Sequence, residues 1–364
     1  MNYFVCQTPW HYYVALNLSV RGKKIIVFGD KLAENTNIVK VCDHLAKDVY
    51  HLWLPKNIPA NSFVNKIRKS VLYISNLRKY FRDIYPERLY VFYNFKWLPI
   101  IKKMFPELKI ILLEDGIGTY KLVAKKLASF EASAGVRQFI HQVTSGFFSE
   151  IYLSQPELVL SSYEKVGSSI IKKLDLAQFG KKAGKASNVS LTEKEKFETS
   201  EVIFFDQCLS YDGLLTFNDE EKLFKNLLQA FANSGYKVLI KLHPRDVQWK
   251  RKFVREFTRL CYSDGEYPFE ELIFQRHVNL NGKIFITYYS SIIFRLIQSG
   301  VSGMYFLLDI RDKINKKHFS VVNESYLFYD EIFRKTERNM RIVKKIEDAL
   351  IENRSTKIYF STPS

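Results

Sequence analysis

The sequence predicts an α/β protein with two doubly wound domains, each built on a parallel sheet covered by helices on both faces. Short, continuously apolar runs alternate with amphipathic, helix-like segments. This alternation is typical of strands that are buried on both faces of a parallel sheet. A polar stretch near residue 180 interrupts it, and the alternation then restarts. The length of 364 residues also fits two domains, at roughly 150 residues per domain.

In the first half, the apolar runs predict strands and the segments between them predict helices. The predicted strands cover 2–6, 24–29, 49–54, 88–93 and 109–114. The predicted helices include 11–19, 35–46 and the basic, aromatic segment 61–84. We therefore place an N-terminal Rossmann-like domain at 1–180.

In the second half, the same reasoning predicts another domain after a linker. Residues 172–195 are polar and carry two glycines, and we place the linker at 181–198. The C-terminal domain spans 199–337. Its predicted strands are 201–207, 236–244, 271–276, 283–290 and 304–309, and its predicted helices are 219–234, 247–260 and one from 291. Residues 338–364 form the C-terminal segment, with a last helix predicted near 338–352. One arrangement open to this helix is packing back on the N-terminal domain.

Composition narrows the function classes. The hydrophobic fraction of 47% allows each half a core, and the four cysteines form no C-x-x-C pair, which argues against disulfides and zinc. The N-terminus lacks a signal-peptide pattern, and no apolar run reaches the ~18 residues of a membrane span, so we expect a cytosolic protein. The net charge of +17 attracts polyanions such as nucleic acid, an anionic membrane face or an acidic glycan. Because no nucleic-acid recognition motif occurs, we expect no nucleic-acid partner.

The first chemical motif is LLEDGIGTY, residues 112–120. Glu114 ends a predicted strand, where ligands of open parallel sheets bind. Glu114 and Asp115 repel each other, which favours one of them as a base, and Gly116 lets a substrate approach the backbone. An Asp-Gly pair is also an ordinary strand-ending turn, so the motif alone leaves both interpretations open.

The second motif is KVLIKLHPRD, residues 237–246. His243 follows a strand, and Pro244 is placed to open a helix. Together with Lys241 and Arg245, His243 predicts a phosphate site. The alternative is a histidine that only caps its own loop.

The third motif is ITYYSSIIFRL, residues 286–296. Ser290 and Ser291 fall between a predicted strand and a predicted helix. One hydroxyl is expected to cap the helix, and the other is available to a phosphate oxygen. Capping alone would explain a single serine.

The order of these motifs resembles the signature of the bacterial sialyltransferases. That signature is an acidic-acidic-Gly motif, here at 114–116, then His-Pro, here at 243–244, then Ser-Ser, here at 290–291. The Cys-Gln-Thr-Pro turn at 6–9 is similar to glycosyltransferase family 52, the lipooligosaccharide sialyltransferases. The string EDGIGTYK also looks like the capsule polysialyltransferases.

The resemblance implies a GT-B fold, with two Rossmann-like domains facing a central cleft. It implies an inverting transfer of sialic acid from CMP-sialic acid to a hydroxyl of a cell-surface glycan, lipooligosaccharide or capsule, with no metal or other cofactor. No Asp-x-Asp metal motif occurs, in agreement with this. The implied catalytic residues are Asp115 as the base, Glu114 and His243. The implied donor-binding residues are Gly116, Lys241, Pro244, Arg245, Ser290, Ser291 and an acidic residue before the Ser-Ser motif, Glu270 or Glu271.

Several alternatives stay open at this point. In the first, the protein is a glycosyltransferase that uses another donor, CMP-Kdo or a UDP-sugar. In the second, it binds a nucleotide sugar without catalysis. A basic nucleic-acid-binding protein is the rival from a different class. The segment 61–84 has two interpretations. It binds the anionic face of the inner membrane or an acidic acceptor, or it is an ordinary helix that covers the sheet. A homodimer is one of the open oligomeric states.

Overall fold

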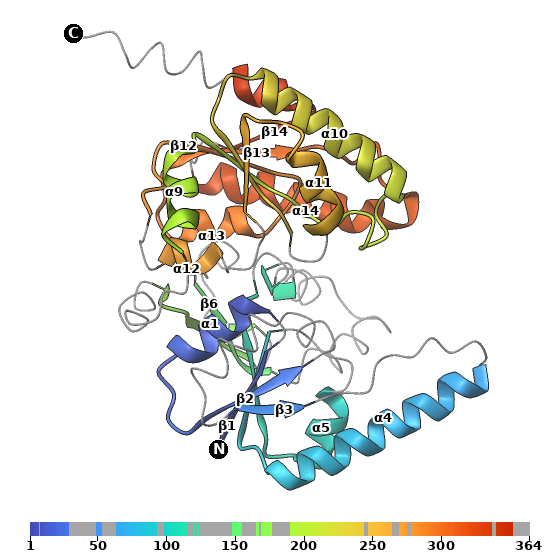
Figure 1. Cartoon of the computed structure of the whole chain (residues 1–364). Helices are drawn as coiled ribbons and strands as arrows, with labels where there is room; N and C mark the ends of the chain where they lie inside the picture. The colour runs from blue at the N-terminus through green and yellow to red at the C-terminus, as the bar shows by residue number, and fades with distance from the viewer. Residues whose placement is uncertain are drawn as a thin grey trace. The chain divides into compact units, whose positions relative to one another are not determined.

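The computed structural model divides into two compact units, Met1–Lys182 and Ala183–Ser364, which are described separately below. Each unit holds a parallel sheet with helices, which confirms the predicted α/β class (Figure 1). The structure describes residues 1–6, 8–28, 49–52, 63–92, 98–115, 119–120, 122–123, 148–154, 165–166, 169–176, 190–243, 247–263, 269–274, 278–336 and 340–351.

The first sheet has the strand order β3-β2-β1-β4-β5-β6-β8-β7. Its strands are β1 (Asn2–Cys6), β2 (Lys23–Phe28), β3 (Val49–Leu52), β4 (Arg88–Val91), β5 (Lys109–Leu113), β6 (Phe148–Leu153), β7 (Lys165–Val166) and β8 (Ser169–Lys173). The paired strands run parallel except for the short hairpin of β7 and β8. The chain order reverses between β1 and β4, where Phe4 pairs with Tyr90 and the two rings stack at 4.3 Å.

Helices α1 (Pro9–Asn17), α4 (Phe63–Ile84) and α5 (Leu98–Met104) belong to this unit. Thr8 caps α1, because its hydroxyl accepts a hydrogen bond from the backbone N–H of His11, and Pro9 occupies the first turn, where its missing N–H costs nothing. Helices α4 and α5 contact each other (Figure 1). No helix among the described residues is both long enough and apolar enough to cross a bilayer.

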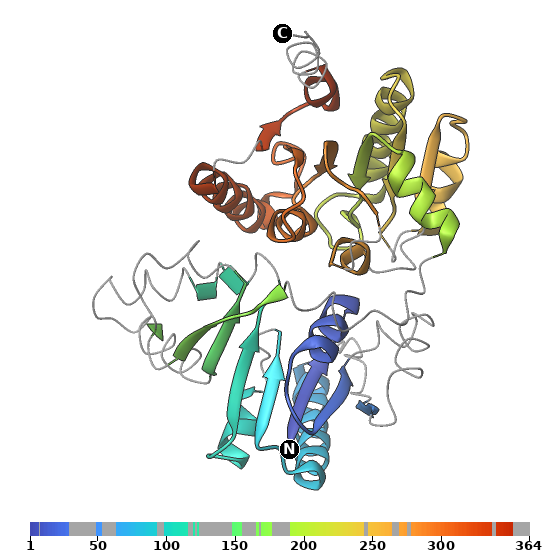
Figure 2. The same cartoon turned by 90° about the vertical axis from the view of Figure 1, so that its left-hand side faces the viewer.

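The second sheet has the strand order β11-β10-β9-β12-β13-β14. Helices lie beside its strands (Figure 2). Its strands are β9 (Val202–Phe205), β10 (Val238–Lys241), β11 (Leu260–Ser263), β12 (Lys283–Thr287), β13 (Gly303–Leu308) and β14 (Met340–Val343). Every residue of β9, β10 and β12 is buried, as expected for central strands covered on both faces. The chain order reverses between β9 and β12, both of which are central.

The helices of the second unit pack around this sheet. They are α9 (Leu191–Thr199), α10 (Phe217–Asn233), α11 (Val247–Val254), α12 (Phe269–Phe274), α13 (Ile292–Gln298), the short 3₁₀ helix η3 (Lys316–His318) and α14 (Phe319–Thr336). Gly303 lets β13 lie close to β12, because a Cβ atom there would come within 2.6 Å of the carbonyl oxygen of Lys283 and 2.8 Å of the Phe285 ring.

The strand predicted at 271–276 is wrong. Residues 269–274 form helix α12, in which Phe269, Leu272 and Ile273 are buried. These positions are three and four residues apart, which is the spacing of a helix face. A short apolar run does not distinguish a strand from a buried helical turn, and the strand in this region is β11, which the predicted helix 247–260 had partly covered.

The segment predicted as a linker also differs in part. Residues 191–199 form α9, whose Phe197 is buried against Phe269 of the second unit. The C-terminal helix predicted near 338–352 is also wrong in its first half, because β14 forms there and pairs with β13. Residues 346–351 are helical and pack within the second unit, since the Tyr236 hydroxyl donates to the carbonyl of Leu350 at 3.3 Å. The predicted helix 35–46 and residues 352–364 lie outside the described residues.

Candidate active site

The first candidate site lies at the carboxyl end of β5, where Glu114 and Asp115 follow the strand. Strand β4 lies between β5 and β1, so the ends of β5 and β1 are about 10 Å apart, at two strand spacings. Helix α1 starts just after β1, and its side chains reach the residues that follow β5. The indole N–H of Trp10 donates to the backbone carbonyl of Glu114 at 3.0 Å.

Glu114 is fully buried, and its carboxylate accepts hydrogen bonds from uncharged groups. Its Oε2 atom accepts hydrogen bonds from the Tyr120 hydroxyl at 2.8 Å, the Ser154 amide at 2.6 Å and the Ser154 hydroxyl at 2.8 Å. A buried carboxylate without such partners would be costly. These bonds join the ends of β5 and β6 and fix the backbone that carries the next residue.

Asp115 forms a close pair with His11. The Nε2 atom of His11 lies 2.6 Å from Oδ1 of Asp115, and the imidazole ring stacks on Phe92 with the ring centroids 4.0 Å apart. Phe92 directly follows β4, so the histidine reaches across the end of that strand. His11 is fully buried, whereas the Asp115 side chain is 21% exposed. An ionised carboxylate can only accept, so Nε2 is the donor of this bond.

The backbone amide of Asp115 donates to the Thr119 hydroxyl at 2.9 Å, which holds the residue at a second point. The arrangement therefore presents one carboxylate oxygen to an imidazole and leaves the side chain partly open to solvent. A carboxylate held in this way can accept a proton from a hydroxyl group that approaches it.

Sequence reasoning missed His11. It lies inside the apolar segment PWHYYVAL, where a polar residue is unusual, and it follows the first strand of the chain by five residues. That position is the signal that would have found it, because the first strand of a doubly wound sheet is central and functional residues gather beyond its carboxyl end.

The second candidate site lies at the carboxyl ends of β10, β9 and β12, which are neighbours in this order. His243 comes two residues after β10 and is half-buried. Its Nδ1 atom lies 2.8 Å from Sγ of Cys208, on the segment that follows β9. Its backbone amide donates to Oδ2 of Asp206 at 3.5 Å.

Ser290 and Ser291 follow β12, and both are half-buried. The Ser290 hydroxyl accepts from the amide of Ile292 at 3.3 Å, and its carbonyl accepts from the Tyr329 hydroxyl at 2.7 Å. Ser291 stands at the N-cap position of α13 without a side-chain capping bond. The ends of β10 and β12 are about 10 Å apart, at two strand spacings, so His243 and the serines belong to one edge of the sheet.

The remaining predicted residues receive less support. Lys241 is the last residue of β10 and is 9% exposed, so little of its side chain is accessible to a ligand. Glu270 and Glu271 lie on α12, but their side chains are outside the described residues, as are Gly116, Pro244 and Arg245. Their roles stay predictions.

A buried ion cluster lies next to the second candidate site, and sequence reasoning missed it. The ammonium group of Lys250 contacts both oxygens of Asp206 at 2.9 Å and Oε1 of Glu220 at 2.6 Å. The three side chains are at most 2% exposed. Burial raises the pKa of Asp206 to about 6, although Lys250 opposes that shift. The two carboxylates raise the pKa of Lys250 against the opposing effect of its own burial.

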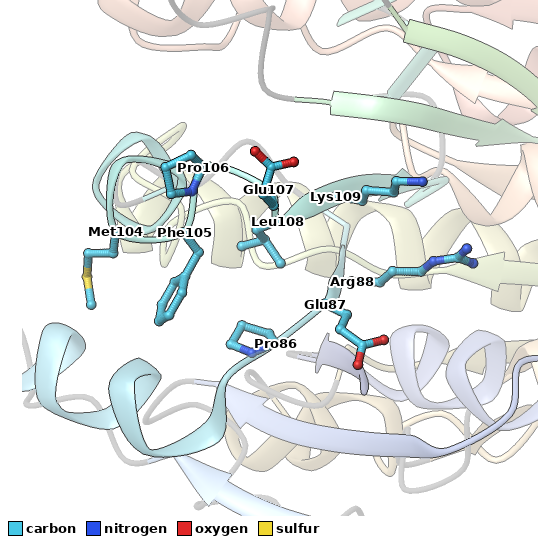
Figure 3. Close-up of a pocket in the computed structure, with 9 residues that line it drawn as sticks. All are labelled: Pro86, Glu87, Arg88, Met104, Phe105, Pro106, Glu107, Leu108 and Lys109. Atoms are coloured by element: carbon cyan, nitrogen blue, oxygen red, sulfur yellow. The ribbon is translucent and has the colours of Figure 1, made fainter.

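A pocket of about 530 Å³ lies elsewhere in the first unit. Residues 86–88 and 104–109 line it, as Figure 3 shows. These residues precede or begin β4 and β5, so the pocket lies at the amino ends of the strands, the opposite edge from Asp115. Functional groups of doubly wound sheets gather at the carboxyl ends, and we assign this pocket no role in the reaction.

Comparison with known proteins gives the family and the fold of the chain. The family model "Alpha-2,8-polysialyltransferase (POLYST)" matches residues 4–297. No curated protein matches the sequence. Among solved structures, Arabidopsis thaliana UGT89C1 complexed with UDP-L-rhamnose is 12% identical, with 94% of this chain and 85% of that chain covered and a TM-score of 0.58. A putative UDP-N-acetylglucosamine 2-epimerase from Listeria monocytogenes is 9% identical, with 98% and 87% covered and a TM-score of 0.57.

A UDP-glucosyltransferase from Polygonum tinctorium, capable of glucosylating indoxyl, is 10% identical, with 99% and 98% covered and a TM-score of 0.52. At these identities the likeness shows the fold alone, and it confirms the predicted GT-B class with its two Rossmann-like units. The cleft predicted with that class stays a prediction. Since the family model covers most of the chain, the protein belongs to the alpha-2,8-polysialyltransferase family and is a glycosyltransferase.

Proposed function

We propose that the protein transfers sialic acid from CMP-sialic acid to a hydroxyl of a glycan, with Asp115 as the base. The observation that carries this proposal is the 2.6 Å contact between His11 and Asp115 at the carboxyl end of β5. It supports Asp115 over Glu114, because Glu114 is fully buried and accepts three hydrogen bonds. Glu114 is then a positioning residue that holds the strand end.

In this mechanism the acceptor hydroxyl gives its proton to Oδ2 of Asp115 while its oxygen attacks the anomeric carbon of sialic acid. The bond from that carbon to the phosphate oxygen breaks, and CMP leaves with the bonding electrons. A single displacement inverts the anomeric configuration. His11 keeps Oδ1 occupied and so orients the carboxylate. A positioned base contributes roughly 10²- to 10⁴-fold in rate.

The departing CMP carries negative charge, and the second edge offers donors for it. We assign the phosphate to Nε2 of His243 and to the hydroxyls of Ser290 and Ser291. Their half-buried positions support this, and neighbouring groups contact the His243 ring and the Ser290 hydroxyl. Donors that are already in place stabilise developing charge without reorganisation. One phosphodiester needs few cationic partners, so the proposal includes no metal.

The exposed face of α4 is our candidate for the surface that binds an anionic partner on the acceptor side. Arg78, Lys79 and Arg82 are exposed on it, and Val71 and Leu72 are 60% and 55% exposed. We propose that this face contacts an acidic glycan or the cytoplasmic face of the inner membrane, which places the reaction in the cytoplasm. Basic and apolar side chains together are typical of such contacts.

Changing Arg78, Lys79 and Arg82 to Gln tests that face. We expect the KM for a large anionic acceptor to rise and the KM for a small neutral acceptor to stay unchanged. Added salt should produce the same difference on the unmodified protein, because exposed charges act over about 8–10 Å. Equal kinetics with both acceptors would leave this face as an ordinary helix surface.

The main experiment incubates the protein with CMP-sialic acid and either a lactose-ended or a sialylated acceptor, with and without EDTA. CMP release and product mass are measured. We expect a product heavier by one or more sialic acid residues, with equal rates in both buffers. CMP-Kdo and UDP-sugars serve as competing donors. Transfer from a UDP-sugar and not from CMP-sialic acid would overturn the donor assignment, and loss of activity in EDTA would overturn metal independence.

A further inference from the structure

Cys208 contacts the His243 ring, and it has no role in the mechanism above. Its side chain is 1% exposed, and its Sγ atom lies 2.8 Å from Nδ1 of His243. We infer that Cys208 is a positioning residue: its thiol donates a hydrogen bond to Nδ1 of His243, which leaves the Nε2–H to meet the phosphate of the donor. This inference rests on the proposed function of His243.

The chemistry of the imidazole ring gives the reason. A neutral histidine carries one N–H donor and one acceptor nitrogen, and the bond at one nitrogen decides which is which. A thiol is a donor, although a weak one. When the thiol donates to Nδ1, the proton of the ring must be on Nε2. In the other tautomer Nε2 would present a lone pair, which repels a phosphate oxygen.

The backbone on both sides of Cys208 is held by the buried ion cluster. Lys250 donates to the carbonyl of Gln207 at 2.9 Å, on the residue before the cysteine. The Glu220 carboxylate accepts from the amides of Leu209 and Ser210 at 3.1 and 2.7 Å, on the residues after it. The thiol is therefore fixed on a segment with little freedom to move. A fixed donor orients the His243 ring before the ligand arrives, which reduces the ordering cost of binding.

The test compares Cys208→Ala, which removes the donor, with Cys208→Ser, which restores one. Cys261→Ala is the matched control, because Cys261 is an exposed thiol on β11 of the same unit. CMP is the probe, and calorimetry measures its affinity. Removal of one neutral hydrogen bond should weaken CMP binding by roughly fivefold in Cys208→Ala. Cys208→Ser and Cys261→Ala should bind CMP as the unmodified protein does.

A spectroscopic measurement reports the tautomer directly. The protein is labelled with ¹⁵N-histidine, and the His243→Ala variant assigns the His243 signals among the seven histidines of the sequence. We expect Nε2 to carry the proton in the unmodified protein without ligand, and we expect a mixture of tautomers in Cys208→Ala. A role of Cys208 in packing alone would leave the tautomer unchanged.

A double-mutant cycle completes the test. If Cys208 acts through His243, the loss from Cys208→Ala disappears in the His243→Ala background. An equal loss in both backgrounds, or an unchanged tautomer in Cys208→Ala, would overturn the inference. If Cys208→Ala does not fold, Cys208→Ser carries the test, since a serine variant with an altered tautomer contradicts donation. Failure of the unmodified protein to bind CMP would overturn the proposed function instead, while the tautomer measurement would still report on the contact.

Discussion

The two units share one strand order, but their carboxyl edges hold opposite chemistry. Among the described strands, the first six of each unit run third, second, first, fourth, fifth and sixth across the sheet, and the first sheet continues with β8 and β7. At the first edge a buried carboxylate, Glu114, accepts hydrogen bonds from uncharged donors, and the group beside it, which is partly exposed, is another acid. At the second edge two buried carboxylates surround Lys250, and the accessible groups are an imidazole and two hydroxyls.

The difference shows how one fold serves two electrostatic tasks. At the first edge Glu114 accepts hydrogen bonds from neutral hydroxyl and amide groups, beside the proposed base. Lys250 offsets the charge of Asp206, which lies just below the proposed phosphate-binding residues. An unpaired carboxylate in that position would repel a phosphate. The two edges therefore differ in their buried groups: neutral hydrogen-bond donors contact Glu114 at the first, and the Lys250 ammonium group contacts Asp206 at the second.

The largest expected effect comes from breaking the ion cluster of the second edge. Lys250→Met leaves Asp206 and Glu220 buried together without a cation, and removal of one partner from a buried ion cluster costs about 3–5 kcal/mol. Denaturant unfolding measures the loss. Lys252→Met is the control, because Lys252 is exposed on the same helix. Equal stability of the two variants would contradict the structural role of the cluster.

The next effect separates the two acids of the first edge. Asp115→Asn removes the proposed base and should lower kcat by roughly 10²- to 10⁴-fold, with little change in CMP affinity. Steady-state transfer assays and calorimetry measure the two quantities. Asp83→Asn, an exposed acid on α4, serves as the control. An Asp115→Asn variant with normal turnover would refute the assignment.

A smaller effect is expected from the neutral donors around Glu114. Ser154→Ala removes the hydroxyl at 2.8 Å from Oε2 but keeps the backbone amide. Hydrogen bonds to charged groups contribute about 1.5–3 kcal/mol, and the free energy of unfolding should fall by that amount. Ser149→Ala, which removes a bond to the neutral carbonyl of Ile110, should cost less. The reverse order would mean that Glu114 does not depend on these donors.

The smallest effect is a difference in pH dependence. Burial raises the pKa of Asp206 from 3.8 to about 6. A raised carboxyl pKa means that the folded state binds a proton more readily, so this contribution to stability is present below pH 4 and is lost as the pH rises through 6. Arg311 lowers the pKa of Asp309, so its contribution is present above pH 4 and is lost on acidification.

Unfolding curves between pH 3 and 7 for Asp206→Asn and Asp309→Asn test these opposite signs. Relative to Asp206→Asn, the unmodified protein should lose stability as the pH rises from 4 to 6. Relative to Asp309→Asn, it should lose stability as the pH falls through the acid range. The same sign in both comparisons would contradict the burial argument for Asp206.

The sequence was sufficient for the central strands and for the edge at which the motifs lie. Runs such as NYFVC and KIILL are apolar at every or nearly every position, because central parallel strands are buried on both faces. It was insufficient for β6, whose residues FSEIYL mix polar and apolar side chains because only part of the strand is buried.

Contacts between distant residues were also beyond sequence reasoning. His11 and Asp115 are 104 residues apart, and no spacing rule joins them. Lys250 resembles the other basic residues of its amphipathic helix, and its burial depends on carboxylates 44 and 30 residues earlier. Charge pairs of this kind become visible only when the topology brings β9, α10 and α11 together.

The position of β9 at the centre of its sheet has a consequence for synthesis on the ribosome. Strand β1 waits for β4, which ends at Val91, 85 residues after Cys6. Strand β9 waits in the same way for β12, which ends at Thr287, 82 residues after Phe205. At about 5–20 residues per second, one edge of the apolar strand VIFF stays unpaired for about 4–16 s. Such a strand can pair with other chains. We therefore expect nascent chains stalled in this interval to depend on chaperones more than chains stalled after Thr287 has emerged.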